Sequence, residues 1–262
     1  MSILRKPAVA GSFYPERPEI LRKMIWQFLD EASAAGAVPK ALIAPHAGYI
    51  YSGPIAASAY KRLLSAKDRI KRVVLLGPSH RVGFEGLALS SADAFLTPLG
   101  SISIDKEAYK LIAHLPQVFV MDQAHQREHS LEVHLPFLQE VLGDFKLVPI
   151  AVGEASPQTV SEVLEALWGG EETLIVISSD LSHYYDYESA RALDSATSRA
   201  IELLRPEDIG HEQACGRRPV NGLLLSAKKH HLHAKTVDLR NSGDTAGSRD
   251  EVVGYGAYVF EN

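Results

Sequence analysis

The chain alternates short, continuous apolar runs with longer stretches in which apolar residues recur every three or four positions. The short runs are typical of β-strands that are buried on both faces of a sheet, as in a parallel sheet covered by helices. We therefore predict strands at residues 41–44, 73–76, 87–89, 147–151, 174–177, 236–239 and 257–260.

The longer stretches predict amphipathic helices, because a spacing of three or four residues places apolar side chains on one helix face. We predict helices at residues 18–35, 53–64, 105–113, 131–142, 156–168, 187–204 and 220–229. Pro136 should lie in a first turn or bend its helix. The alternation predicts an α/β fold: a mainly parallel or mixed central sheet flanked by helices, in one domain over residues 1–262.

Composition narrows the class of protein. The chain has 262 residues, 46% of them hydrophobic, and a net charge of −5. It carries no basic stripe, so we expect no nucleic-acid partner. The single cysteine, Cys215, excludes a disulfide framework and a cysteine-rich zinc site. We read no signal peptide and no apolar run near the ~20 residues of a membrane span, so we expect a soluble, cytoplasmic protein without membrane contact.

Four of the predicted strands end in polar phrases that contain glycine, proline, histidine or aspartate. They occupy residues 45–49, 77–80, 178–183 and 241–244. In an open α/β sheet the residues past the carboxyl ends of the strands line the ligand crevice. Two histidines and a carboxylate with open coordination positions suit non-haem iron(II), and nearby unligated histidines can then move protons. The recurrence of such phrases predicts one shared site.

Each phrase also has an ordinary structural interpretation. A histidine after a strand is usually a hydrogen-bonded loop residue, and Asp244 beside a glycine suits a tight turn. His129 and His134 are five residues apart, so at most one of them should face a common site. Cys215 has no strand-end phrase around it, which leaves a thiol nucleophile unsupported.

Several phrases together resemble the Memo-like family. They are VAGSFYP, APHAGYIYSG, GPSH, EHSLEVHLPFL and SSDLSH, with VGYGAY as a weaker match, and they run from residue 9 to residue 258. The resemblance implies a fold similar to that of the class III extradiol dioxygenases, which open catechol rings with iron(II) and O₂.

The same resemblance implies roles for particular residues. His46 and His80 match the two metal-binding histidines, and Asp244 falls where the third ligand is expected. His183 and His129 match histidines that orient or protonate substrate and O₂. The dioxygenases usually have a glutamate as third ligand and animal Memo proteins a cysteine, whereas Cys215 lies elsewhere in this sequence. Asp250 is the alternative third ligand.

Three functions follow as expectations. The first is a metal-dependent oxidoreductase that uses iron(II), with copper as the alternative metal. The second is a module that holds a peptide or an anionic small molecule in the same crevice without turnover, with Arg127, Tyr49 and Tyr51 as contact residues. The third is a role beside a radical-SAM protein or an AMMECR-like protein, which the family resemblance implies.

Overall fold

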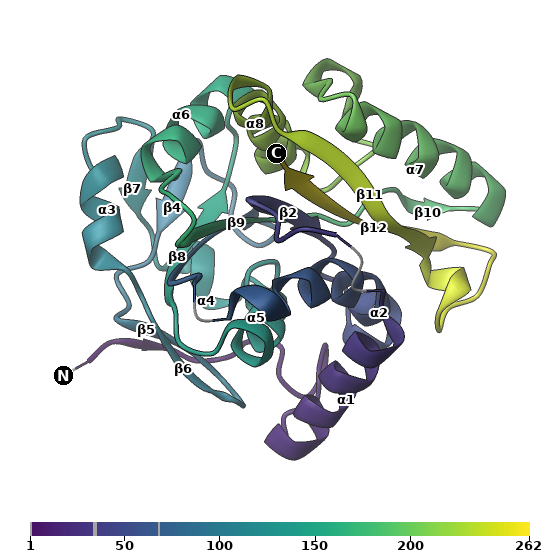
Figure 1. Cartoon of the computed structure of the whole chain (residues 1–262), viewed down its shortest axis with the longest axis horizontal. Helices are drawn as coiled ribbons and strands as arrows, with labels where there is room; N and C mark the ends of the chain where they lie inside the picture. Colours follow the sequence, from purple (N-terminus) through teal and green to yellow (C-terminus); the bar gives the residue numbers. More distant parts are fainter. Residues whose placement is uncertain (1, 34–35, 68) are drawn as a thin grey trace.

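The computed structural model describes residues 2–33, 36–67 and 69–262. Its centre is a nine-stranded sheet in the order β10-β12-β2-β9-β3-β8-β4-β7, with β11 paired to β12 (Figure 1). The strands of this sheet are β2 (Ala41–Ala44), β3 (Arg72–Pro78), β4 (Leu87–Leu89), β7 (Val118–Val120), β8 (Lys146–Val152), β9 (Thr173–Ser178), β10 (His183–Tyr185), β11 (His233–Asn241) and β12 (Val252–Glu261).

The helices that surround the sheet fall between these strands along the chain. They are α1 (Pro18–Glu31), α2 (Tyr49–Tyr60), α3 (Lys106–Ile112), α4 (Gln123–Gln126), α5 (Leu135–Leu142), α6 (Pro157–Leu167), α7 (Tyr187–Glu202) and α8 (Arg217–Lys229). Short 3₁₀ helices are η1 (Lys61–Ala66), η2 (Glu132–His134), η3 (Pro206–Asp208) and η4 (Ser242–Asp244).

The middle of the sheet is parallel and its flanks are antiparallel. Strands β2, β9, β3 and β8 run parallel to one another, whereas β12 is antiparallel to β2 and β4 is antiparallel to β8. The expected α/β fold with a mixed central sheet flanked by helices is therefore confirmed. Parallel neighbours matter for function because their carboxyl ends meet at one edge.

Successive strand residues enter two different apolar cores, because side chains alternate between the faces of a strand. Leu42 and Val73 pack with α1, α2 and α5 on one face, and Ile43 and Val74 pack with α3, α6 and α8 on the other. Figure 1 shows α1, α2 and α5 below the sheet and α6 and α8 above it. Both faces are covered, which explains the continuous apolar runs of the central strands.

Some predicted boundaries differ from the structure. The helix expected over 53–64 begins earlier, at Tyr49, and becomes the 3₁₀ helix η1 after Tyr60. Pro54 therefore lies inside α2 and cannot donate to the carbonyl of Ile50. Ile50 is exposed, so water can satisfy that carbonyl. The helix expected over 18–35 ends at Glu31, and residues 34–35 of that prediction lie outside the described residues.

A small sheet that the sequence pattern did not predict lies beside the main one. Its strands are β1 (Leu4–Arg5), β5 (Ala94–Thr97) and β6 (Gly100–Ser103), with β1 parallel to β5. These segments are too short, and too mixed in polarity, to give a periodic signal. Within the described ranges, we find no helix with the length and apolar character needed to cross a membrane.

The buried carboxylate of Glu132 fixes the segment that follows β1. It is fully buried and accepts hydrogen bonds from the backbone N–H groups of Ala8 (2.7 Å) and Val9 (3.0 Å) and from the Tyr14 hydroxyl (2.5 Å). It also pairs with the Arg5 guanidinium. A buried carboxylate requires such partners, so the N-terminal segment is held firmly onto η2.

One prediction concerns the buried His134, which hydrogen-bonds to the Tyr60 hydroxyl at 2.7 Å. Burial lowers the pKa of His134 to about 3. The unfolded chain therefore binds a proton below about pH 6.5 that the folded chain does not, so this residue makes folding less favourable as pH falls. We expect the free energy of unfolding, measured by urea denaturation, to fall between pH 6.5 and pH 5. This fall should be roughly 2 kcal/mol smaller for His134→Phe than for wild type.

The matched control for this prediction is His114→Gln, because His114 is exposed. Its stability should fall with pH in parallel with wild type. Parallel curves for His134→Phe and wild type would refute the assignment of this pH dependence to His134.

Candidate functional site: a histidine and cysteine cluster

Three neighbouring parallel strands end at the same edge of the sheet, and each delivers a polar residue there. His46 follows β2, Ser178 ends β9, and His80 follows β3. The strand order β2-β9-β3 places these residues side by side. The sequence predicted that His46 and His80 come together. In the structure their ring centroids lie 5.1 Å apart.

The buried imidazole of His46 has one nitrogen bound to the protein. Its Nδ1 lies 2.6 Å from the Ser178 hydroxyl, and that hydroxyl donates its own proton to the Ser130 carbonyl at 2.6 Å. Nδ1 must therefore donate to Ser178, which leaves the lone pair of Nε2 free. Burial lowers the pKa of His46 well below its usual value, with His80 and His129 adding to the effect, so the ring is neutral.

The His80 imidazole is held in the same tautomer by Glu128. Its Nδ1 lies 2.9 Å from Glu128 Oε1, and its backbone N–H donates to Oε2 at 2.6 Å. Burial alone would raise the pKa of Glu128, but the hydrogen bond from the His80 side chain and the backbone donors lower it to about 2. The carboxylate is ionised and can only accept, so His80 Nδ1 carries the donated hydrogen, and in the neutral ring Nε2 carries the lone pair.

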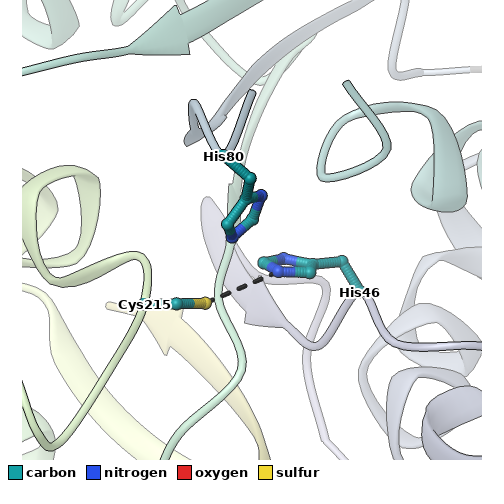
Figure 2. A group of neighbouring side chains, drawn as sticks. All are labelled: His46, His80 and Cys215. Atoms are coloured by element: carbon teal, nitrogen blue, oxygen red, sulfur yellow. Dashed lines mark hydrogen bonds between the residues drawn. The ribbon is translucent and has the colours of Figure 1, made fainter. Parts of the chain in front are cut away.

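Cys215 completes the cluster from the loop that precedes α8. Its Sγ lies 3.5 Å from His46 Nε2, as Figure 2 shows. The same sulfur accepts from the Asp180 backbone N–H at 3.3 Å. Burial, together with the Asp180 charge, raises the pKa of the thiol above its usual value. The thiol is therefore protonated and can donate to His46 Nε2.

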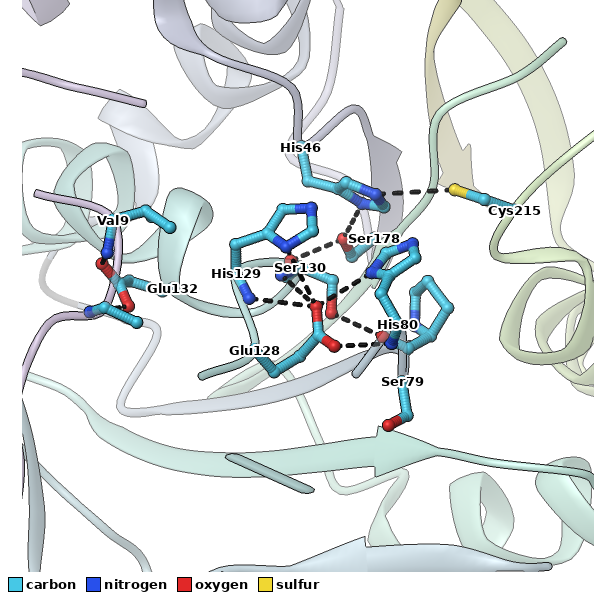
Figure 3. Close-up of polar contacts among 12 residues, drawn as sticks. Val9, His46, Ser79, His80, Glu128, His129, Ser130, Glu132, Ser178 and Cys215 are labelled. Carbon is cyan, nitrogen blue, oxygen red and sulfur yellow. Dashed lines mark hydrogen bonds and ion pairs between the residues drawn. The ribbon is translucent and has the colours of Figure 1, made fainter. Parts of the chain in front are cut away.

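Among the described residues, two groups of side chains could each hold a metal ion. In the first group, the ligand atoms of His46, His80 and Cys215 lie within 4.8 Å of one another. The second group consists of His80, Glu128 and His129. In that group the Glu128 carboxylate already accepts from His80 and from the backbone of His129 (3.0 Å) and Ser130 (2.9 Å), so the first group is the better site (Figure 3).

The two further histidines of the sequence prediction lie in different places around this cluster. The His129 ring is 5.4 Å from the His46 ring and 4.8 Å from the His80 ring, and Phe13 packs on it at 4.9 Å. Burial lowers the pKa of His129 to about 4. His183 lines a cavity of about 410 Å³ together with His80 and Cys215, which gives the cluster an opening for a ligand.

Asp244 does not lie in the cluster. Its carboxylate accepts from the Asn241 backbone N–H at 3.0 Å and from the Tyr187 hydroxyl at 2.6 Å. It follows β11, and β12 lies between β11 and β2. Two strand spacings of about 4.8 Å therefore separate the end of β11 from that of β2. Asp250, the alternative, is exposed in the loop before β12 and belongs to neither ligand group.

Cys215 is the residue that the sequence interpretation set aside. A backbone contact brings it to the site: a Cβ on Gly216 would lie 2.5 Å from the Ser178 carbonyl oxygen, so only glycine permits this approach. Glycine directly after the single cysteine is a signal for such an approach. Asp180 was also missed; its Oδ1 accepts from the His46 backbone N–H at 2.7 Å.

The residues expected to contact a peptide or anion are dispersed. Tyr49 is buried, and its hydroxyl donates to the Val133 carbonyl at 2.8 Å, so it has a structural role. Tyr51 is half-buried in α2 against the apolar core. Arg127 is exposed and lines a different cavity.

The fold and the cluster together thus define an α/β protein with two histidines and one cysteine at the carboxyl edge of its parallel strands.

Comparison with known proteins places this protein in a family. A family model described as Memo-like protein matches residues 5–259. A MEMO1 family protein of Aquifex aeolicus is 38% identical over 270 residues, covering 98% of this chain and 99% of that protein. One from Archaeoglobus fulgidus is 36% identical, with 98% and 99% covered. The chain therefore belongs to the Memo-like family, as the sequence phrases predicted.

A solved structure shares the fold. The uncharacterized protein JW3007 from Escherichia coli K12 is similar with a TM-score of 0.53, and the match covers 84% of this chain and 98% of that chain. The two sequences are 14% identical, so this likeness concerns the fold alone.

A prediction follows for Glu128, the carboxylate that orients His80. Its pKa of about 2 lies below the ordinary value of about 4.5, so the ionised form stabilises the fold above pH 4.5 and loses this effect as pH falls toward 2. Glu128→Gln should lower the free energy of unfolding by roughly 2–3 kcal/mol at pH 7 in urea denaturation. Glu85→Gln, on an exposed loop residue, should be neutral. Equal stability of the two variants would contradict this role.

Proposed function

We propose that the protein binds one metal ion through His46, His80 and Cys215, with iron(II) as the expected metal and copper as the alternative. The observation that carries the proposal is the tautomer of both histidines. Ser178 and Glu128 each hold a protonated Nδ1, so in the neutral rings both Nε2 lone pairs are directed to a metal ion or to the Cys215 thiol instead of to other protein groups. Hydrogen bonds of this kind orient metal-binding histidines in proteins.

The donor atoms fit such an ion chemically. Imidazole nitrogen suits iron, copper and zinc, and thiolate sulfur favours the same metals over magnesium and calcium. The Cys215 thiol is protonated without a metal because burial raises its pKa. Binding of a metal should release that proton, as is usual for cysteine ligands.

We further propose that the site serves an oxidoreductase similar to the extradiol dioxygenases. A bound metal ion would supply open coordination positions for O₂ and for an oxygen-bearing substrate. A small molecule would enter through the cavity that His80, His183 and Cys215 line. His183 donates through Nδ1 to the Leu181 carbonyl at 2.8 Å, so its Nε2 is free to accept a proton. Neutral His129 is the second proton acceptor beside the cluster.

We also propose a cellular compartment and partner proteins. A single cysteine fits a reducing compartment, so we propose the cytoplasm. The family resemblance implies a radical-SAM protein or an AMMECR-like protein as a partner.

The metal assignment predicts which substitutions remove the ion. Purified wild-type protein should hold about one iron or copper ion per chain by metal analysis. His46→Ala and Cys215→Ser should lose most of it, because each removes one donor atom. Asp244→Asn is the matched control and should keep the metal, since Asp244 lies two strands away.

Two outcomes would overturn this ligand set. One is equal metal content in wild type and His46→Ala. The other is loss of metal from Asp244→Asn with retention in Cys215→Ser.

The reaction class is tested by O₂ consumption. Protein loaded anaerobically with iron(II) should consume O₂ when simple catechols are added. His183→Ala should slow consumption while keeping the metal, since its imidazole is placed to accept a proton. A fully loaded site that binds catechols without O₂ uptake would rule out the enzyme and favour a ligand-binding module.

A further inference from the structure

A second cavity, of about 1180 Å³, lies on the other side of the loop that carries His80. It is bounded by the N-terminal residues around β1, by α4 and by Arg81, whereas His80 faces the cavity of the cluster. Val82 borders both cavities. Small-molecule sites usually measure about 300–1,000 Å³, so this cavity has room for a ligand as large as a nucleotide.

The cavity is cationic in a chain whose net charge is −5. Four basic residues line it: Arg5, Lys6, Arg81 and Arg127. The Arg5 guanidinium is already bound by Glu132 and by backbone carbonyls. Within the described ranges, the other three basic side chains form no ion pair.

The acidic side chain in the lining does not neutralise them. Asp122 accepts from the Ser90 hydroxyl at 2.9 Å and from the Ser91 backbone N–H at 2.8 Å. These bonds to serine lower the pKa of Asp122 against the opposing effect of burial, so it is ionised. Its single negative charge stands against three positive charges, and a concave surface with such an excess concentrates anions.

A buried histidine also lines this cavity. His125 is 1% exposed and lines the cavity. Its Nε2 donates to the Ala88 carbonyl at 2.9 Å, so Nδ1 carries a lone pair, and this atom has no partner among the described residues. This lone pair cannot bind an anionic oxygen, so anion binding in the cavity depends on the three cationic side chains.

We propose that this cavity binds a small polyanion with at least two phosphate or carboxylate groups, held by Lys6, Arg81 and Arg127. Guanidinium groups bind phosphate and carboxylate through paired hydrogen bonds, and lysine adds a mobile charge. This site is separate from the histidine and cysteine cluster and does not depend on its metal.

The proposal is tested by calorimetric titration of the metal-free protein with tripolyphosphate and, separately, with citrate. At least one of them should bind with one-to-one stoichiometry, and its affinity should fall as the salt concentration is raised. The double variant Arg81→Gln/Arg127→Gln should bind at least tenfold more weakly, and so should Lys6→Gln/Arg127→Gln. The probe that binds more tightly identifies phosphate or carboxylate as the preferred group.

The control is Arg199→Gln, an exposed arginine in the last turn of α7, which should bind the probe as wild type does. The cavity variants should keep their unfolding midpoint and the metal content of wild type, which separates this proposal from that of the metal site. Absence of one-to-one binding at millimolar probe, or equal affinity in the double variants and wild type, would overturn the proposal.

Discussion

The arrangement of the candidate site depends on the buried, ionised carboxylate of Glu128. It accepts four hydrogen bonds, two from His80 and one each from the backbone of His129 and Ser130. These bonds join the loop after β3 to the loop before η2. Ser130 then continues the connection, because its carbonyl accepts from Ser178, whose hydroxyl holds His46. One desolvated charge thus orients both imidazoles, directly at His80 and through two serine residues at His46.

The fold supplies the positions and this polar network supplies the orientation. Parallel strands β2, β9 and β3 bring His46, Ser178 and His80 to one edge of the sheet. A second buried carboxylate, Glu132, holds the N-terminal segment, whose Phe13 covers His129. Each buried carboxylate has the donors that its burial requires, so the two together keep the loops over the sheet edge in a defined arrangement.

The sequence predicted the part of this site that depends on local pattern. Apolar runs followed by histidine identified β2 and β3 and hence His46 and His80. The third member depends on strand order, which periodicity does not contain: β12 returns between β11 and β2 and keeps Asp244 away. Cys215 approaches through a close backbone contact at Gly216, a feature of tertiary packing. The small sheet of β1, β5 and β6 escaped prediction because its strands are short.

X-ray absorption spectroscopy of the iron-loaded protein tests the central claim most directly. We expect a sulfur atom in the first coordination shell of the wild-type protein, together with imidazole nitrogens. A first shell of nitrogen and oxygen alone in the wild-type protein would contradict the proposed site of two histidines and one cysteine.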